Sequence, residues 1–190
     1  MTDADGALVH GDPVTVADRR ATVTVPGQSV TTFLVEGVSG VARDAALVQR
    51  GGEYTLTGVQ SGRALTADAA GTGTVIRTPD AADAAQTWEL EKVTRGETNR
   101  ERYVLTSAAD GRRLAERDGS VVLEPDRGRA PAAAQWIMST TGDGTWTLVT
   151  AASGRVLEVP GQATSDGAPV GTWQPNSGAN QRWTVTETQP

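Results

Sequence analysis

The chain has no cysteine, a single histidine and few aromatic residues: five tryptophans, two tyrosines and one phenylalanine among 190 residues. Without cysteine it has no disulfide bonds, no thiol catalysis and no Cys-ligated metal. One histidine, His10, excludes a histidine metal cluster, and we interpret it as a surface loop residue. The sequence therefore predicts neither a metal site nor a cofactor.

Clustered positive charge and long apolar runs are also absent. The formal net charge of −6 argues against a nucleic-acid partner, whose phosphates require clustered Lys and Arg, and disfavours an anionic membrane surface. No run approaches the roughly 20 apolar residues of a membrane-spanning helix. The first residues lack the basic and apolar regions of a signal peptide, so if the protein is secreted, we expect its signal to lie outside this chain.

Turn-forming and β-branched residues dominate what is present. The chain contains 22 Gly and 9 Pro, and its apolar residues fall in short alternating runs such as YTLT, YVLT, WTLV and WTVT. No apolar period of 3.6 residues persists for three turns. Alternation of this kind is typical of strands, so the sequence predicts an all-β fold.

One pattern occurs three times along the chain. Each copy has an aromatic residue, a Leu two places on, and a Ser-Gly-Arg or Asp-Gly-Arg turn followed two places later by Leu. The copies are YTLTGVQSGRAL (54–65), YVLTSAADGRRL (103–114) and WTLVTAASGRVL (146–157), and they are followed by Trp88, Trp136 and Trp183, respectively. The spacing defines three units of about 45 residues.

We expect each unit to contain a strand, a tight turn, a second strand, a variable loop and a strand that ends on the closing tryptophan. No unit of this size could bury its apolar face alone, so the three should share one core. Closing them into a ring would remove free sheet edges.

These units resemble the ricin B-type lectin β-trefoil, also called the family 13 carbohydrate-binding module. The resemblance covers about residues 46–187 and rests on the closing Gln-any-Trp motif. It implies that the Trp fills the shared core and that the Gln ties down a loop. The motif assigns these roles to Gln86 and Trp88, to Gln181 and Trp183, and to Trp136 alone in the second unit, where Ala134 replaces the Gln. We therefore predict a β-trefoil carbohydrate-binding domain over residues 41–190.

Trp173 has no counterpart in the other units. Six of the eight aromatics occupy the two repeated positions, which predicts that they belong to the core, and Phe33 belongs to the N-terminal segment. An extra tryptophan in a polar loop suits sugar binding, because the C–H face of a pyranose can lie on an indole ring. The alternative is that Trp173 packs as a loop anchor.

The ricin-like resemblance also implies a complete sugar site in the third unit. There Glu158 and Asn180 would hold adjacent sugar hydroxyls, Trp173 would stack beneath the ring and Gln181 would support the acid, with Glu standing where the family has Asp. The matching positions in the first two units lack this set of acid, ring and amide: Thr66, Thr78 and Ala85, then Ala115, Asp126 and Ala133. We predict one working site.

Residues 1–40 do not join the repeat and are expected to form three short strands. The segment VTVPGQSVTTFLVEG resembles the last strands of the β-sandwich that follows the catalytic barrel in glycoside hydrolase family 30. This resemblance implies a partial β-sandwich at residues 1–40 and a catalytic domain upstream in the same polypeptide.

The leading hypothesis is thus a non-catalytic, lectin-like module that targets a secreted glycoside hydrolase to a glycan. The ricin-like resemblance implies galactose-containing polysaccharides as the first expectation, with xylan as the second. The alternative is a structural spacer whose sugar sites have decayed. We do not expect the chain to be an enzyme by itself, because a catalytic barrel takes about 250 residues.

Overall fold

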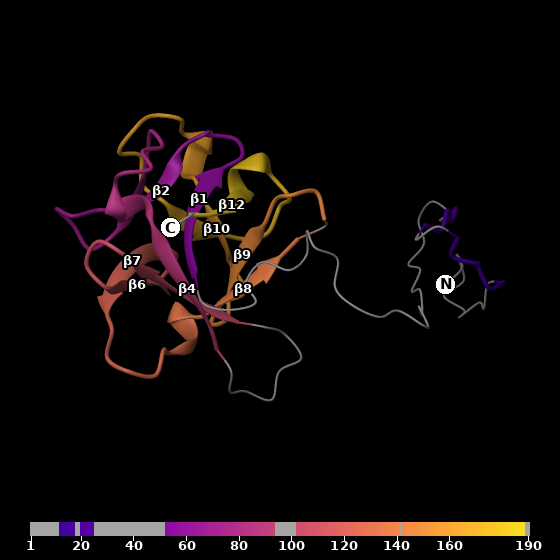
Figure 1. The fold of residues 1–190 in the computed structure, drawn as a ribbon, viewed down its shortest axis with the longest axis horizontal. Helices are drawn as coiled ribbons and strands as arrows, with labels where there is room; N and C mark the ends of the chain where they lie inside the picture. The colour runs from indigo at the N-terminus through magenta and orange to yellow at the C-terminus, as the bar shows by residue number, and fades with distance from the viewer. Residues whose placement is uncertain (1–11, 18–19, 25–51, 94–101, 141, 189–190) are drawn as a thin grey trace. The chain divides into compact units, whose positions relative to one another are not determined.

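The computed structural model describes residues 12–17, 20–24, 52–93, 102–140 and 142–188 (Figure 1). The chain divides into two compact units, residues 1–40 and 41–190. In the first unit the described residues contain one antiparallel bridge, in which the backbones of Ala17 and Arg20 exchange hydrogen bonds of 3.0 and 2.9 Å. Most of the predicted β-sandwich strands lie outside the described residues, so that assignment stays a prediction.

The second unit is built almost entirely of short strands. The first repeat contains β1 (Gly52–Gly58), β2 (Ala64–Ala67), β3 (Thr74–Arg77) and β4 (Trp88–Lys92). The second contains β5 (Tyr103–Ser107), β6 (Arg112–Arg117), β7 (Ser120–Pro125) and β8 (Trp136–Ser139). The third contains β9 (Thr147–Thr150), β10 (Val156–Glu158), β11 (Gly171–Trp173) and β12 (Trp183–Glu187).

Short 3-10 helices complete the described elements: η2 (Ala84–Gln86), η3 (Ala132–Ala134), η4 (Pro160–Gln162) and η5 (Ala179–Gln181). Three of them, η2, η3 and η5, end two residues before a closing tryptophan. No helix in the described part of the chain is long and apolar enough to cross a membrane.

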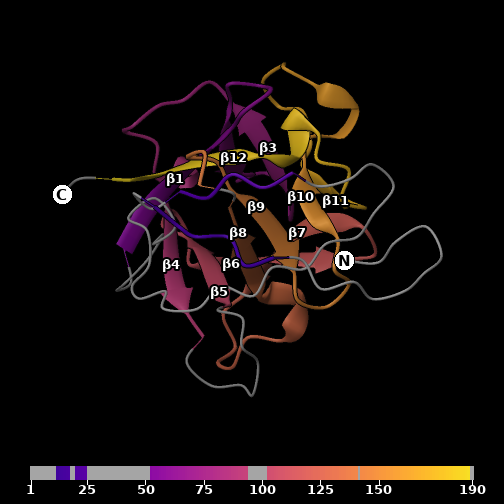
Figure 2. The same ribbon diagram turned by 90° about the vertical axis from the view of Figure 1, so that its right-hand side faces the viewer.

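The first and last strands of each repeat form a closed barrel (Figure 2). Antiparallel pairing runs from β12 through β1, β4, β5 and β8 to β9. Trp146 and Trp183 close the ring by exchanging two backbone hydrogen bonds of 2.8 Å each. Every strand of the barrel is therefore paired on both sides, which leaves no free sheet edge.

Three hairpins, β2–β3, β6–β7 and β10–β11, cap one end of this barrel. Neighbouring hairpins are joined by single bridges, Gly73 with Val122, Val75 with Pro169, and Gly171 with Ser120. A six-stranded barrel capped by three linked hairpins is a β-trefoil. The structure thus confirms the all-β trefoil predicted from the repeat.

The core repeats with the same threefold pattern. Trp88, Trp136 and Trp183 are fully buried. Each indole N–H donates to the carbonyl of a leucine in the second strand of its own unit: Leu65 at 3.0 Å, Leu114 at 2.9 Å and Leu157 at 3.2 Å. The opening aromatics Tyr54, Tyr103 and Trp146 are buried as well. Each closing tryptophan thus fills core volume while its indole N–H remains paired.

Two details of the predicted unit are wrong. The closing tryptophan begins its strand and does not end it, as β4, β8 and β12 show. Each unit also has an additional strand, the third in chain order (β3, β7 or β11), in the segment expected to be a variable loop. These strands have three to six residues, too few for alternation to identify them against the neighbouring Gly and Pro residues.

Candidate functional site

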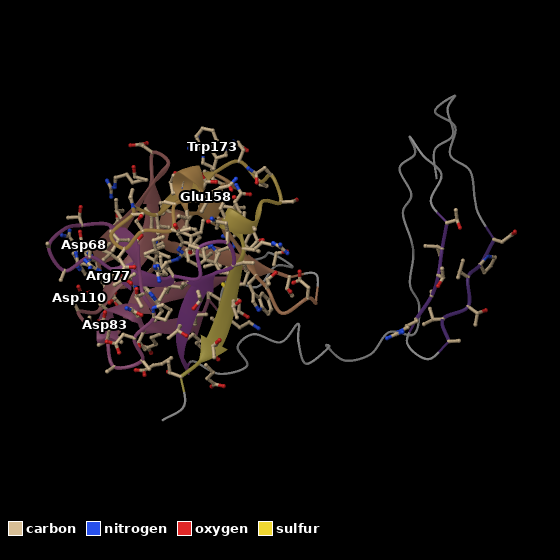
Figure 3. All side chains as sticks on the ribbon, turned by 90° about the horizontal axis from the view of Figure 1, so that it is seen from above. Asp68, Arg77, Asp83, Asp110, Glu158 and Trp173 are labelled. Carbon is tan, nitrogen blue, oxygen red and sulfur yellow. The ribbon has the colours of Figure 1, made fainter. Side chains whose placement is uncertain are left out.

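The β10–β11 hairpin carries the acid and the ring of the predicted site. Its register pairs Val156 with Trp173, Leu157 with Thr172, and Glu158 with Gly171. Paired residues project to the same face and successive residues alternate, so Glu158 and Trp173 share one face of the hairpin, as Figure 3 illustrates. Because Gly171 has no side chain, the position directly opposite Glu158 does not cover its carboxylate.

Glu158 is buried, with 8% of its surface exposed. Its Oε2 atom accepts hydrogen bonds from Gln181 Nε2 at 3.0 Å and from Asn180 Nδ2 at 3.4 Å. Among the described residues no ion pair involves this carboxylate and no hydrogen bond reaches Oε1. One oxygen is therefore anchored by amides, while the other remains available to a ligand hydroxyl.

The short helix η5 presents both amides. Asn180 Nδ2 also donates to the carbonyl of Val159 at 3.1 Å, while the Asn180 carbonyl accepts from the N–H of Val159 at 3.0 Å. Gln181 Nε2 donates to the Gln174 carbonyl at 3.0 Å, and its Oε1 accepts from the N–H of Asn176 at 2.9 Å. These contacts fix the orientation of each amide, so both donate to Glu158.

Trp173 is the last residue of β11 and does not lie in a loop, contrary to the sequence interpretation of its surroundings. Its side chain is 56% exposed, more than any other large hydrophobic residue described. The backbone at this position is fixed by pairing with Val156. A large apolar ring is therefore held in water on the face that also carries the acid.

The strand register corrects which residues of the first two units are equivalent to Trp173. Pairing Ala64 with Arg77 and Arg113 with Glu124 places Arg77 and Glu124 there, one and two residues away from Thr78 and Asp126. The positions equivalent to Glu158 are Thr66 and Ala115, and those equivalent to Asn180 are Ala85 and Ala133, as the sequence predicts. In the described residues, acid, ring and amide come together in the third unit alone.

Gln135 is a residue that the sequence interpretation missed. Ala134 occupies the place of the motif glutamine and is buried. The neighbouring Gln135 ties the loop in its stead, because its Nε2 donates to the Ala130 carbonyl at 2.8 Å and its Oε1 accepts from Arg102 Nη1 at 3.0 Å. The signal in the sequence that could have identified Gln135 is a glutamine one position after the expected place of the motif glutamine.

No group of three or more His, Cys, Asp or Glu side chains in the described part of the chain is arranged to hold a metal ion. The site consists of one carboxylate, two amides and an indole. This set offers hydrogen-bond donors, an acceptor and an apolar surface, which are the groups that a sugar ring requires.

The sequence matches the family described as ricin-type β-trefoil lectin domain-like over residues 45–125 and 132–190. It is 36% identical, across all of this chain, to an exo-β-1,6-galactobiohydrolase of Bifidobacterium longum subsp. longum. The chain spans 13% of the length of that relative.

Solved structures share the fold. The designed threefold-symmetric protein ThreeFoil is 29% identical, with a TM-score of 0.61, over 70% of this chain and 96% of its own. The ricin B-like lectin of Macrolepiota procera, solved in complex with lactose, is 21% identical, with a TM-score of 0.58, over 73% of this chain and 96% of its own.

The family match, the closed barrel and the repeated Trp-to-Leu hydrogen bond lead to one assignment. The chain belongs to the ricin-type β-trefoil lectin domain-like family.

Proposed function

We propose that residues 41–190 form a non-catalytic carbohydrate-binding module whose main site, in the third repeat, is made of Glu158, Trp173, Asn180 and Gln181. The observation that carries this proposal is the exposed Trp173 ring on the same hairpin face as a carboxylate with one anchored and one free oxygen. A ligand that both stacks on an indole and donates hydroxyl groups fits this combination.

The binding energy divides into two parts. Stacking a sugar face on Trp173 contributes about 1–3 kcal/mol through buried apolar area. A hydroxyl that donates to Glu158 adds about 1.5–3 kcal/mol, because the acceptor is charged. Because Trp173 is 56% exposed, much of the sugar would stay in water, so the dissociation constant should lie between about 10 μM and 1 mM.

The target we propose is a galactose-containing glycan, with xylan as the second choice. The name of the Bifidobacterium relative, a galactobiohydrolase, supports galactose. The resemblance of the third unit to the family 13 carbohydrate-binding modules also supports a sugar ligand, with Glu158 standing where that family has Asp.

We further propose that the module works within a larger secreted glycoside hydrolase, attached through the β-sandwich strands expected at residues 1–40. The match along the whole chain to a relative of which it spans 13% supports this setting. Attachment would keep a catalytic domain close to its polymer, since tethering raises the effective concentration without new contacts.

The test is titration calorimetry with lactose and with xylobiose, using the full 190-residue chain and three variants. Trp173→Ala removes the stacking ring, and Glu158→Gln removes the charged acceptor while it leaves Trp173 as a fluorescent reporter. Each should weaken lactose binding by at least about tenfold. The matched control is Arg77→Ala, which truncates the equivalent strand-end position in the first unit and should bind like the parent.

Two results would contradict the proposal. If neither the calorimetric heat nor the tryptophan fluorescence changed with any galactose- or xylose-based glycan, the result would favour the alternative of a structural spacer whose sugar sites have decayed. If Trp173→Ala and Glu158→Gln both bound the glycan as strongly as the parent does, the site would have to lie elsewhere on the trefoil.

A further inference from the structure

The arginines of the three Gly-Arg turns, Arg63, Arg112 and Arg155, hold the trefoil units together unequally. Arg63 reaches the third unit, where its Nε donates to the Thr164 carbonyl at 3.0 Å and pairs with Asp166 Oδ1 at 3.1 Å. It thus binds one backbone carbonyl and one carboxylate.

Arg112 makes the equivalent contact with the first unit. Its Nη1 donates to the Gly71 carbonyl at 2.9 Å and its Nη2 to the Asp68 carbonyl at 3.1 Å. Its Nε also donates to Asp110 Oδ2 at 2.8 Å. Carbonyl oxygens together with a carboxylate again satisfy the guanidinium.

Arg155 lacks these partners. Within the described residues its guanidinium makes no hydrogen bond and no ion pair. The cause is the length of the hairpin loop it faces: β6 and β7 are joined by Asp118 and Gly119 alone, with φ values of 51° and 83°, as in a two-residue type I′ turn. The β10–β11 and β2–β3 hairpins have longer loops, whose carbonyls reach Arg63 and Arg112, respectively.

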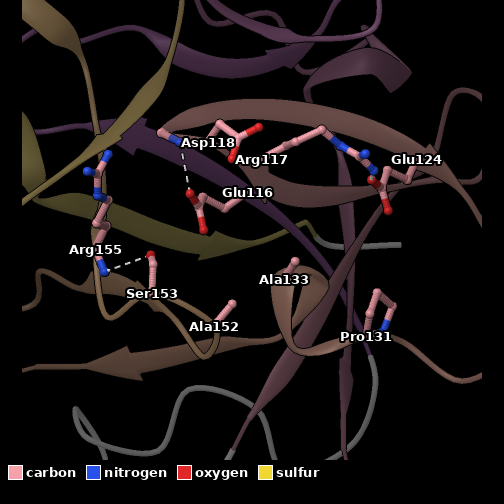
Figure 4. Close-up of a pocket in the computed structure, with 10 residues that line it drawn as sticks. Glu116, Arg117, Asp118, Glu124, Pro131, Ala133, Ala152, Ser153 and Arg155 are labelled. Carbon is pink, nitrogen blue, oxygen red and sulfur yellow. Dashed lines mark hydrogen bonds and ion pairs between the residues drawn. The ribbon is translucent and has the colours of Figure 1, made fainter.

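The short turn leaves a pocket of about 670 Å³ between the second and third units (Figure 4). Arg155 lines it beside Gly119, where a Cβ would lie 2.6 Å from its Nη1. The β6–β7 hairpin lines it with Arg117 and Glu124, which pair with each other, and with Glu116, whose Oε1 accepts from the Gly119 N–H at 2.9 Å. Pro131, Ala133 and Ala152 supply apolar lining.

We propose that this pocket binds a hexuronic acid residue of a glycan, with the sugar carboxylate on Arg155. The external carboxylate would take the place that Asp166 takes at Arg63 and Asp110 takes at Arg112. A guanidinium with unused donors matches a carboxylate in a two-pronged arrangement. The inference goes beyond the proposed function, because the pocket uses none of the residues of the Trp173 site.

The other charges of the pocket make the ligand more specific. Glu116 and Asp118 also line it and neither pairs with Arg155, so a bare anion is repelled as well as attracted. Ring hydroxyls can donate to Glu116 while the carboxylate of the same sugar accepts from Arg155. A uronic acid supplies both groups, whereas acetate supplies one.

The experiment is a titration of the full 190-residue chain, ¹⁵N-labelled, followed by NMR. Methyl β-D-glucuronide is compared with its neutral counterpart methyl β-D-glucoside and with acetate. The glucuronide should shift the amide signals of Gly119 and Ser153, and the other two compounds should not. Arg155→Gln should weaken this response at least about tenfold, while Arg77→Gln, an exposed arginine outside the pocket, should leave it intact.

Shifts at Gly119 and Ser153 that persist in Arg155→Gln, or that the glucoside or acetate produces equally, would overturn the proposal. So would the absence of any shift at Gly119 with millimolar glucuronide. The indole signal of Trp173 in a separate lactose titration reports on the proposed galactose site, so failure of one site is distinguished from failure of the other.

Discussion

Replacing Gln181 by Ala should destabilise the fold more than the same change at Gln86. Both glutamines are buried and both tie a loop. Gln86 donates to the Thr78 carbonyl at 3.1 Å and accepts from the Asp80 N–H at 2.8 Å, which matches the two loop contacts of Gln181 with Gln174 and Asn176. Their loss should cost about 0.5–1.5 kcal/mol per bond in either unit.

The difference between the two variants comes from the acid that each glutamine contacts. Gln181 donates to the buried Glu158 at 3.0 Å, whereas Gln86 has a 3.3 Å contact with Asp83, which is partly exposed and can be rehydrated. Leaving a buried charged acceptor without its donor costs about 1–3 kcal/mol. Gln181→Ala should therefore lower the free energy of unfolding by about 1–3 kcal/mol more than Gln86→Ala.

Urea denaturation of both variants measures this difference, provided that the slopes with denaturant agree. A double-mutant cycle with Glu158→Ala isolates the pair and should give a coupling of at least about 1 kcal/mol. Equal losses in Gln181→Ala and Gln86→Ala, with no coupling to Glu158, would refute the conclusion that Gln181 holds the acid.

Two further predictions concern stability. Trp183→Ala should lower the free energy of unfolding by about 3–5 kcal/mol because the ring is fully buried, whereas Trp173→Ala should change it by less than about 0.5 kcal/mol; the same denaturation curves check both. The hydrogen bond from Arg112 lowers the pKa of Asp110 below its usual value of 3.8. The stability that the ionised Asp110 contributes to the fold is therefore present above that usual pKa and is lost as the pH falls through the lowered pKa. The stability difference between the parent and Asp110→Asn should therefore shrink between about pH 5 and pH 2, and a constant difference in denaturation midpoint would contradict this.

The sequence contained enough to predict the trefoil, because Trp88, Trp136 and Trp183 recur at a spacing that a shared core requires. It did not contain enough to place the third strand of each unit. Without that strand the register is lost, so the sequence predicts Thr78 as the equivalent of Trp173, whereas strand pairing places Arg77 there. A β register is set by pairing across the sheet, so counting along one chain with loops of unequal length shifts it.

The same limit applies to the turn arginines. Three Gly-Arg steps look alike in the sequence, yet Arg63 and Arg112 bind a neighbouring unit while Arg155 lines a pocket. The difference depends on the length of the hairpin loop that each arginine faces in a neighbouring unit. For Arg63 that loop belongs to the third unit, which lies far away in the chain. Only the assembled structure brings the two together.

This arrangement makes the third-unit site depend on the first unit. The segment after Glu158 is held from outside, because Gln60 donates to the Gln162 carbonyl at 2.9 Å and Arg63 to the Thr164 carbonyl at 3.0 Å. The segment begins with Val159, whose carbonyl orients Asn180. The inward-facing rings are fixed by the fold in all three units, whereas the groups of the proposed sugar site in the third unit are positioned by the first unit. The geometry of that proposed site is therefore coupled to closure of the trefoil.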